Sequence, residues 1–359
     1  MPTQFATMVL AAGAVLTAGS ALAGEDAAVP LRLIGDAPTM GAGEARRFVI
    51  DARVTQRNGY PEIKGWLAAL PPETGFTFIA GFCHQGEACT LAFYRETRRI
   101  RFTGDLLASQ AEIAGRFEIS AGRGGEAGEG VVTFTPFTDA VPGIGTLVQL
   151  DAVDSPGLND LLLWNAPTAV LNVSAGPIDE VDRELLAQWQ VAQGRPGTGL
   201  LLTSDLEQLT RHRAVQQKAL GWTLVAAADK GWSAGYPAAL MHPIGGTGTE
   251  QRFASADGNA HLTIAIDAPV DQAGLDGMIQ QLIEDPAGKR TDMHVDGKGP
   301  DQAISYVERR RMVTQIYRNR PAGLARLVFS YPERSKVYAD IAPLVSLSLA
   351  VADDVRPAP

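Results

Sequence analysis

The segment Gly231-Trp232-Ser233-Ala234-Gly235 has the G-x-S-x-G spacing of a serine nucleophile. In hydrolases the serine of this motif lies on a sharp strand-to-helix turn, and an acidic residue and a histidine later in the chain activate it. Three histidines follow the motif: His242, His261 and His294. However, Tyr236-Pro237 and a loop pattern come next, where the motif requires a helix. A serine hydrolase using Ser233 is therefore the alternative function, and a non-enzymatic protein is the leading one.

The first 23 residues have the pattern of an export signal. They contain no charged side chain, and their apolar run is too short to span a membrane. They end in Ala21-Leu22-Ala23, a small-x-small pattern typical of a cleavage site, and no cysteine follows that would carry a lipid. We expect a signal peptide over residues 1–23. The mature protein is then expected in the periplasm or outside the cell, without a stable membrane anchor.

The two cysteines, Cys83 and Cys89, lie six positions apart. A single close pair in an exported chain is typical of a disulfide that closes a hairpin, and such a short loop is worth about 2–2.5 kcal/mol. A zinc site would need more ligands than these cysteines and His84, and the other histidines are scattered singly. The sequence therefore predicts a disulfide and no metal site.

Residues 181–209 predict two helices joined by a polar turn. Leu185 and Trp189 belong to one apolar stripe of the first helix. Glycine and proline then interrupt the pattern, and Ser204 with Glu207 three positions later is a capping-box pattern that begins the second helix. We expect this helical hairpin to occupy residues 176–221.

The hairpin resembles the second half of the peptidoglycan-binding-like module at Trp189, Gln190, Gly194, Thr198, Gly199 and Leu209. Members of that family carry an aromatic-Gln pair at the end of one helix, a glycine-containing turn and a helix that ends in leucine. The resemblance implies a wall-binding groove beside Trp189 and Gln190, with Arg195 directed toward wall carboxylates. The alternative is a packing element in which Trp189 belongs to the core.

The composition excludes one class of partner. The formal net charge is −9, and none of it comes from the predicted signal peptide. A nucleic-acid partner would need a basic surface or stripe, so we expect none. The sequence contains no H-E-x-x-H, phosphate-loop or dinucleotide-binding pattern, and no cofactor is expected.

Residues 24–175 are expected to form a β-rich domain. Short segments that alternate apolar and polar residues recur, separated by turns rich in glycine and proline: 48–54, 62–70, 76–82, 90–95, 100–107, 112–119, 131–137 and 146–150. Short strands at this spacing favour an antiparallel β-sandwich or barrel.

Residues 222–352 predict antiparallel strands with an amphipathic helix at 273–285 and a closing helix at 337–351. The segment resembles the PsbP-like α/β/α sandwich in two motifs, an aromatic strand running into Tyr236-Pro237 and the Phe-x-Ser-x-Asp-Gly hairpin at 253–258. That family is mostly a non-catalytic interaction scaffold, so the resemblance implies the same here. Residues 353–359 are expected to be a disordered tail.

These patterns predict an α+β multidomain protein with an N-terminal antiparallel β-sandwich or barrel, a central helical hairpin and a C-terminal antiparallel sheet with packed helices. The expected function is that of an exported, non-enzymatic cell-envelope protein that binds peptidoglycan or a periplasmic protein. A protein–protein scaffold acting through the C-terminal domain is a further alternative.

Overall fold

The computed structural model describes residues 28–37, 46–71, 75–83, 88–95, 98–108, 110–120, 127–148, 152–165, 178–227, 232–284 and 288–351. The signal peptide and the C-terminal tail expected from the sequence lie outside these residues. The chain divides into two compact units, one formed by residues 1–155 with 176–204 and the other by 156–175 with 205–359. This division separates the two helices of the expected 176–221 hairpin, so it groups the residues differently from the sequence-based domains.

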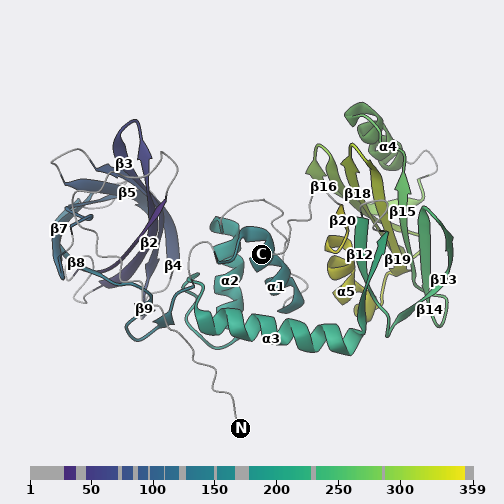
Figure 1. Ribbon diagram of the computed structural model, residues 1–359, viewed down its shortest axis with the longest axis horizontal. Coiled ribbons are helices and arrows are strands. Elements are labelled where there is room, and N and C mark those ends of the chain that lie inside the picture. The colour runs from purple at the N-terminus through teal and green to yellow at the C-terminus, as the bar shows by residue number, and fades with distance from the viewer. Residues whose placement is uncertain are drawn as a thin grey trace, which may run out of the picture. The chain divides into compact units, whose positions relative to one another are not determined.

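Unit 1 is a closed antiparallel barrel whose eight strands follow one another in chain order (Figure 1). The strands are β1 (Val29–Ala37), β2 (Arg46–Arg57), β3 (Tyr60–Ala69), β4 (Gly75–Cys83), β5 (Cys89–Arg95), β6 (Arg98–Gly104), β7 (Ile113–Ile119) and β8 (Gly128–Pro136). Strand β1 pairs with both β2 and β8, which closes the barrel. The barrel form of the predicted sandwich or barrel is confirmed.

The barrel interior is filled by apolar side chains, because successive residues of a strand point to opposite faces and one face of each strand is apolar. Phe48, Phe102 and Phe134 meet there with ring centroids 5.1–6.1 Å apart. The hairpin between β2 and β3 turns at Asn58-Gly59, where both residues have positive φ, 53° and 79°. Such two-residue turns match the twist of paired strands and fix their register.

Part of the outer surface of the barrel is also buried. Ile34, Val49 and Ala68 project outward from β1, β2 and β3 and are covered by Leu147 and Leu200. The covering segments are the short pair β9 (Ala140–Val141) and β10 (Gly145–Thr146) and the loop after helix α2 (Glu180–Ala192). This second apolar cluster attaches the loop after α2 to the outside of the barrel.

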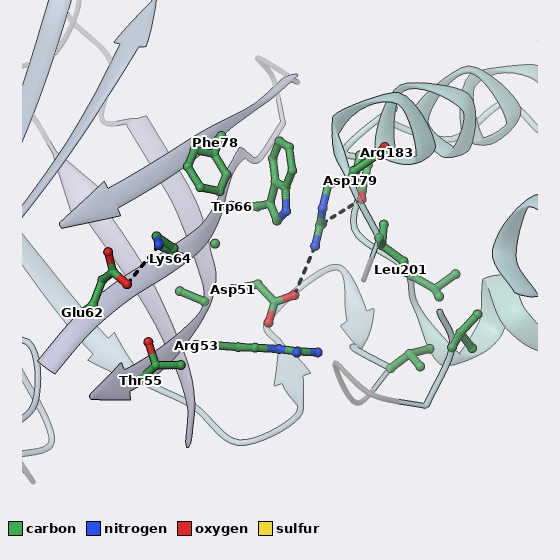
Figure 2. Close-up of a pocket in the computed structure, with 16 residues that line it drawn as sticks. Asp51, Arg53, Thr55, Glu62, Lys64, Trp66, Phe78, Asp179, Arg183 and Leu201 are labelled. Atoms are coloured by element: carbon green, nitrogen blue, oxygen red, sulfur yellow. Dashed lines mark hydrogen bonds and ion pairs between the residues drawn. The ribbon is translucent and has the colours of Figure 1, made fainter. Parts of the chain in front are cut away.

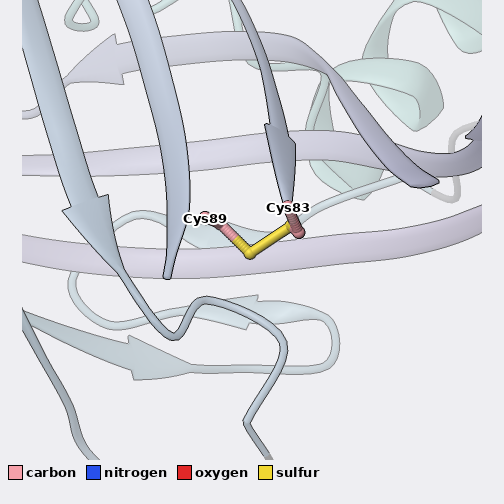
Figure 3. The surroundings of a disulfide bond; sticks show 2 residues. All are labelled: Cys83 and Cys89. Carbon is pink, nitrogen blue, oxygen red and sulfur yellow. A yellow bond between two sulfur atoms is a disulfide. The ribbon is translucent and has the colours of Figure 1, made fainter. Parts of the chain in front are cut away.

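Cys83 and Cys89 form the expected disulfide (Figure 3). They are register partners at the end of β4 and the start of β5, with Cα atoms 4.0 Å apart, and both are buried. The bond therefore closes the β4–β5 hairpin at one end of the barrel.

Unit 2 combines antiparallel sheets with helices, as the sequence predicts. A three-stranded sheet has the order β11-β12-β20, and a seven-stranded sheet has the order β13-β14-β15-β19-β18-β17-β16. Its strands are β11 (Trp222–Ala227), β12 (Trp232–Pro237), β13 (Met241–Thr247), β14 (Glu250–Ser255), β15 (His261–Asp267), β16 (Arg290–Lys298), β17 (Asp301–Glu308), β18 (Arg311–Arg320), β19 (Gly323–Pro332) and β20 (Ala350–Val351). Its helices are α1 (Ser155–Asn165), α3 (Thr203–Leu220), α4 (Gln272–Glu284) and α5 (Lys336–Leu347).

Helices α4 and α5 pack on opposite faces of the seven-stranded sheet (Figure 1). Ile279 of α4 contacts the cluster around Tyr317, whereas Val345 of α5 belongs to the cluster of Ile316, the neighbouring residue of β18. The closing helix is shorter than the predicted 337–351, because residues 350–351 leave it to pair with β12 as β20.

Candidate functional site

The side chains predicted to contact the cell wall lie at the end of α2, and two of them are buried. Trp189 is 4% exposed and Gln190 is 2% exposed. The Arg195 guanidinium carbon lies 5.1 Å from the centre of the Trp189 ring, at a distance typical of a cation–π contact. The structure therefore brings the three predicted residues together, with the Trp189 and Gln190 side chains buried.

Gln190 holds the loop that follows α2. Its Oε1 atom accepts hydrogen bonds from the backbone N–H groups of Thr198 (3.0 Å) and Gly199 (3.1 Å), and its Nε2 donates to the carbonyl of Leu200 (2.9 Å). Gly199 has a φ of 65°, a conformation that glycine adopts without strain. Gln190 thus satisfies buried backbone groups, and its role as a wall contact stays a prediction.

Ser233 lies within strand β12 and not on a turn into a helix. It is the register partner of Ala226 in β11 and of Ala350 in β20, and the strand continues to Pro237. His242 and His261 are exposed residues of β13 and β15. The strand-to-helix turn that a nucleophile elbow requires is not formed at Ser233.

A pocket that the sequence does not predict lies on the outer face of the barrel in unit 1 (Figure 2). Its volume is about 480 Å³. Strands β2, β3 and β4 form one side, and the start of α2 with the loop after it forms the other. The lining residues are Asp51, Ala52, Arg53, Thr55, Glu62, Lys64, Gly65, Trp66, Phe78, Val148, Val153, Ile178, Asp179, Arg183, Gly199 and Leu201.

Asp51 is the buried centre of an ionic network at the base of this pocket. Its Oδ1 lies 3.2 Å from Nε of Arg32, and its Oδ2 lies 3.7 Å from Nη2 of Arg183. Arg183 also donates from Nη1 to the carbonyl of Gly199 at 3.1 Å. Burial lowers the pKa of Arg183 to about 10, and Asp51 partly counteracts that effect. The network attaches α2 and its loop to the outside of β2.

Aromatic rings form the next part of the pocket. The Arg183 guanidinium carbon lies 5.0 Å from the centre of the Trp66 ring, and the Trp66 and Phe78 rings meet edge to face with centroids 5.5 Å apart. Trp66 is 8% exposed, whereas Phe78 is 46% exposed. The Phe78 ring therefore faces solvent, and the buried Trp66 ring packs against it edge to face.

Charged side chains of β2 and β3 complete the groove. Glu62 is bridged by Lys64 (2.9 Å) and Arg57 (3.0 Å), and the hydrogen bond from Lys64 is the main reason why the pKa of Glu62 is lowered. Arg53 and Lys64 are register partners on the outer face of the two strands. Figure 2 shows Arg53 extending from β2 into the space beside Asp51. Two cations thus project from directly opposed positions.

The lining combines charged and aromatic side chains, which can bind a ligand through hydrogen bonds and ring contacts. None of the 16 is a serine, cysteine or histidine. Across the described parts of the chain, no group of three or more His, Cys, Asp or Glu side chains is placed to hold a metal ion. No helix among the described residues is long and apolar enough to cross a membrane.

Comparison with known proteins identifies no family for this chain. No family model matches it, and no curated protein matches it. One similar solved structure is the cyanobacterial PsbP (CyanoP) from Synechocystis sp. PCC 6803, at 11% identity and a TM-score of 0.27, covering 36% of this chain and 92% of that one. The resemblance of residues 181–209 to peptidoglycan-binding-like modules stays a prediction.

Proposed function

We propose that this chain is an exported, non-enzymatic cell-envelope protein that binds peptidoglycan through the pocket on the outer face of β2–β4, which we call the wall groove. The observation that carries the proposal is the groove itself, in which the exposed ring of Phe78 adjoins charged side chains from β2, β3 and α2. An aromatic face offers stacking to a sugar ring, and charged groups offer hydrogen bonds to amides and carboxylates. Both kinds of contact suit a polymer of amino sugars and short peptides.

Two other features support an envelope location. The Cys83–Cys89 disulfide is typical of proteins that fold outside the reducing cytosol. The first 23 residues have the sequence pattern of a signal peptide. This proposal places the wall contact in the wall groove, whereas the sequence predicts it beside Trp189. The wall groove offers side chains that are accessible to a large ligand.

Co-sedimentation of the mature protein with purified peptidoglycan sacculi tests this proposal. Phe78→Ala is the test variant, and Phe82→Ala is its matched control because Phe82 belongs to the same strand, is 43% exposed and does not line the groove. We expect wild type and Phe82→Ala to pellet with sacculi and Phe78→Ala to remain in the supernatant, with circular dichroism showing that all three are folded. Wild-type protein that stays in the supernatant would refute wall binding.

A further inference from the structure

A second pocket lies within unit 2, between helix α5 and the face of the seven-stranded sheet that this helix covers. Its volume is about 360 Å³. Strands β16, β17 and β18 form its floor, and Pro343, Ser346 and Leu347 of α5 line it from the other side. A concave site of this size can enclose a small molecule. We call it the α5 pocket, and the proposed function does not use it.

The strand register gives the floor of the α5 pocket an apolar centre with hydroxyl groups beside it. Ala303 of β17 and Ile316 of β18 are register partners, and both line the pocket. Ser305 and Thr314, two positions along the same strands, are also partners and lie on the same face, because side chains alternate along a strand. Both are half-buried. A molecule that lies on Ala303 and Ile316 therefore has hydrogen-bonding groups at one end.

The charged side chains around the α5 pocket balance one another. Asp301 lies 2.9 Å from Nη1 of Arg318 and 2.7 Å from Nη1 of Arg320, which does not itself line the pocket. Asp296 is the other acid of the lining, so the two acids equal these two arginines in number. A charged ligand would lose its hydration in this pocket without meeting a surplus of opposite charge, and an uncharged ligand avoids that cost.

Ser346 is a buried polar residue of α5 in the lining of this pocket. It is 8% exposed, and among the described residues its Oγ has no hydrogen-bond partner. Buried polar groups normally have a partner, and a buried hydroxyl without one is unfavourable. Because a serine side chain has three staggered rotamers, the Oγ can turn toward a molecule in the pocket. A ligand with a hydrogen-bonding group would then supply the missing partner.

We propose that the α5 pocket binds a small uncharged molecule that has an apolar ring and an amide group. The ring lies between Ile316 of the sheet and Leu347 of α5, and the amide forms a hydrogen bond with the Ser346 hydroxyl. The site belongs to unit 2, whereas the wall groove belongs to unit 1. The protein then has a second ligand, of a different chemical class from the cell wall.

The test compares two probes of the same shape, 2-naphthamide and 2-naphthoate, on the full mature protein. The first is uncharged and the second is an anion. Binding is followed by NMR of the methyl groups of Ile316 and Leu347, which line opposite sides of the pocket. We expect 2-naphthamide to shift both sets of signals until they saturate, and 2-naphthoate to bind at least tenfold more weakly.

Three variants assign the binding to this pocket. Ser346→Ala is expected to weaken 2-naphthamide about threefold to tenfold, because it removes one hydrogen bond, and to leave the free protein no less stable, because it removes an unsatisfied hydroxyl. Ser335→Ala is the matched control, since Ser335 precedes α5, makes no side-chain capping bond and is outside the lining. Ala303→Leu adds bulk to the floor and is expected to abolish binding.

Three results would overturn the inference: no saturable shift with 2-naphthamide, equal or tighter binding of 2-naphthoate, or Ser346→Ala that binds like Ser335→Ala. The Ser346→Ala comparison decides the matter by itself if Ala303→Leu does not fold. Each of these results leaves sacculus binding as it is, because the wall groove shares no residue with the α5 pocket. Failure of sacculus binding likewise leaves the α5 pocket unaffected.

Discussion

Replacing Gln190 with alanine tests whether the Trp189-Gln190 pair is part of the protein's framework. Gln190 is 2% exposed and makes three hydrogen bonds to the backbone of residues 198–200. Alanine removes all three and leaves the α2 loop without its central support. We expect Gln190→Ala to lower the free energy of unfolding of unit 1 substantially.

The magnitude follows from which backbone groups lose a partner. The Thr198 N–H also donates to the Pro196 carbonyl at 3.0 Å, so it keeps one hydrogen-bond partner when Gln190 is replaced. Gly199 N–H and the Leu200 carbonyl lose their hydrogen bonds to Gln190 in a buried environment. Each such group costs about 1–3 kcal/mol, so the two together give about 2–6 kcal/mol.

Urea unfolding measures this loss, with hydrogen exchange of peptides from β1–β8 as the probe so that unit 1 is followed separately from unit 2. Gln188→Ala is the matched control, because Gln188 is an exposed residue of the same helix. It is expected to change stability by less than about 0.5 kcal/mol. Gln190→Ala that matches Gln188→Ala would refute the structural role and restore the pair as a candidate ligand contact.

Three further predictions concern other parts of the molecule. Reduction of the Cys83–Cys89 disulfide is expected to lower the stability of unit 1 by about 2–2.5 kcal/mol, measured as the shift of the urea midpoint with and without reductant at constant slope. Gly65→Ala is expected to cost about 1–3 kcal/mol or more in the same assay, since its Cβ would lie 2.3 Å from a backbone atom of β2; unchanged stability would contradict this. The pKa of Asp257 is lowered to about 2, chiefly by the Ser255 hydroxyl, so its contribution to stability is present above its unfolded-state pKa and is lost as the pH falls through about 2. Carboxyl NMR titration is expected to show a higher pKa in Ser255→Ala, and an unchanged midpoint would rule out that cause.

Much of the fold can be predicted from the alternation of apolar and polar residues along the chain. The strands from β2 to β8 each present one apolar face, and that pattern together with short turns predicts a closed or sandwiched antiparallel sheet. Alternation does not predict β1, because Leu31, Leu33 and Ile34 are all buried, on both faces of the strand. A strand covered on its outer side loses the polar half of its pattern.

The wall groove could not be predicted for a related reason. Asp51 and Arg53 of β2 and Lys64 and Trp66 of β3 do alternate with apolar residues, so the sequence shows them as outward-facing. Nothing local indicates that Arg183, more than a hundred residues later, completes the same site. The Trp189-Gln190 pair, in contrast, is visible in the sequence. The structure places Gln190 in hydrogen bonds to the loop after α2, and the role of the pair as a wall contact stays a prediction.

The division of unit 1 into two stretches of chain has a consequence for how the protein folds. Residues 156–175 belong to unit 2 yet precede residues 176–204 of unit 1 in the chain. Because synthesis proceeds from the N-terminus, all eight barrel strands are made before the loop that carries Leu200. Ile34, Val49 and Ala68 are then covered on the outside of the barrel by Val141 and Leu147, and they lack the cover of Leu200 and Leu202 until that loop is made. A fragment that ends near residue 155 would leave the part of this apolar surface under Leu200 and Leu202 exposed, and is expected to associate with itself.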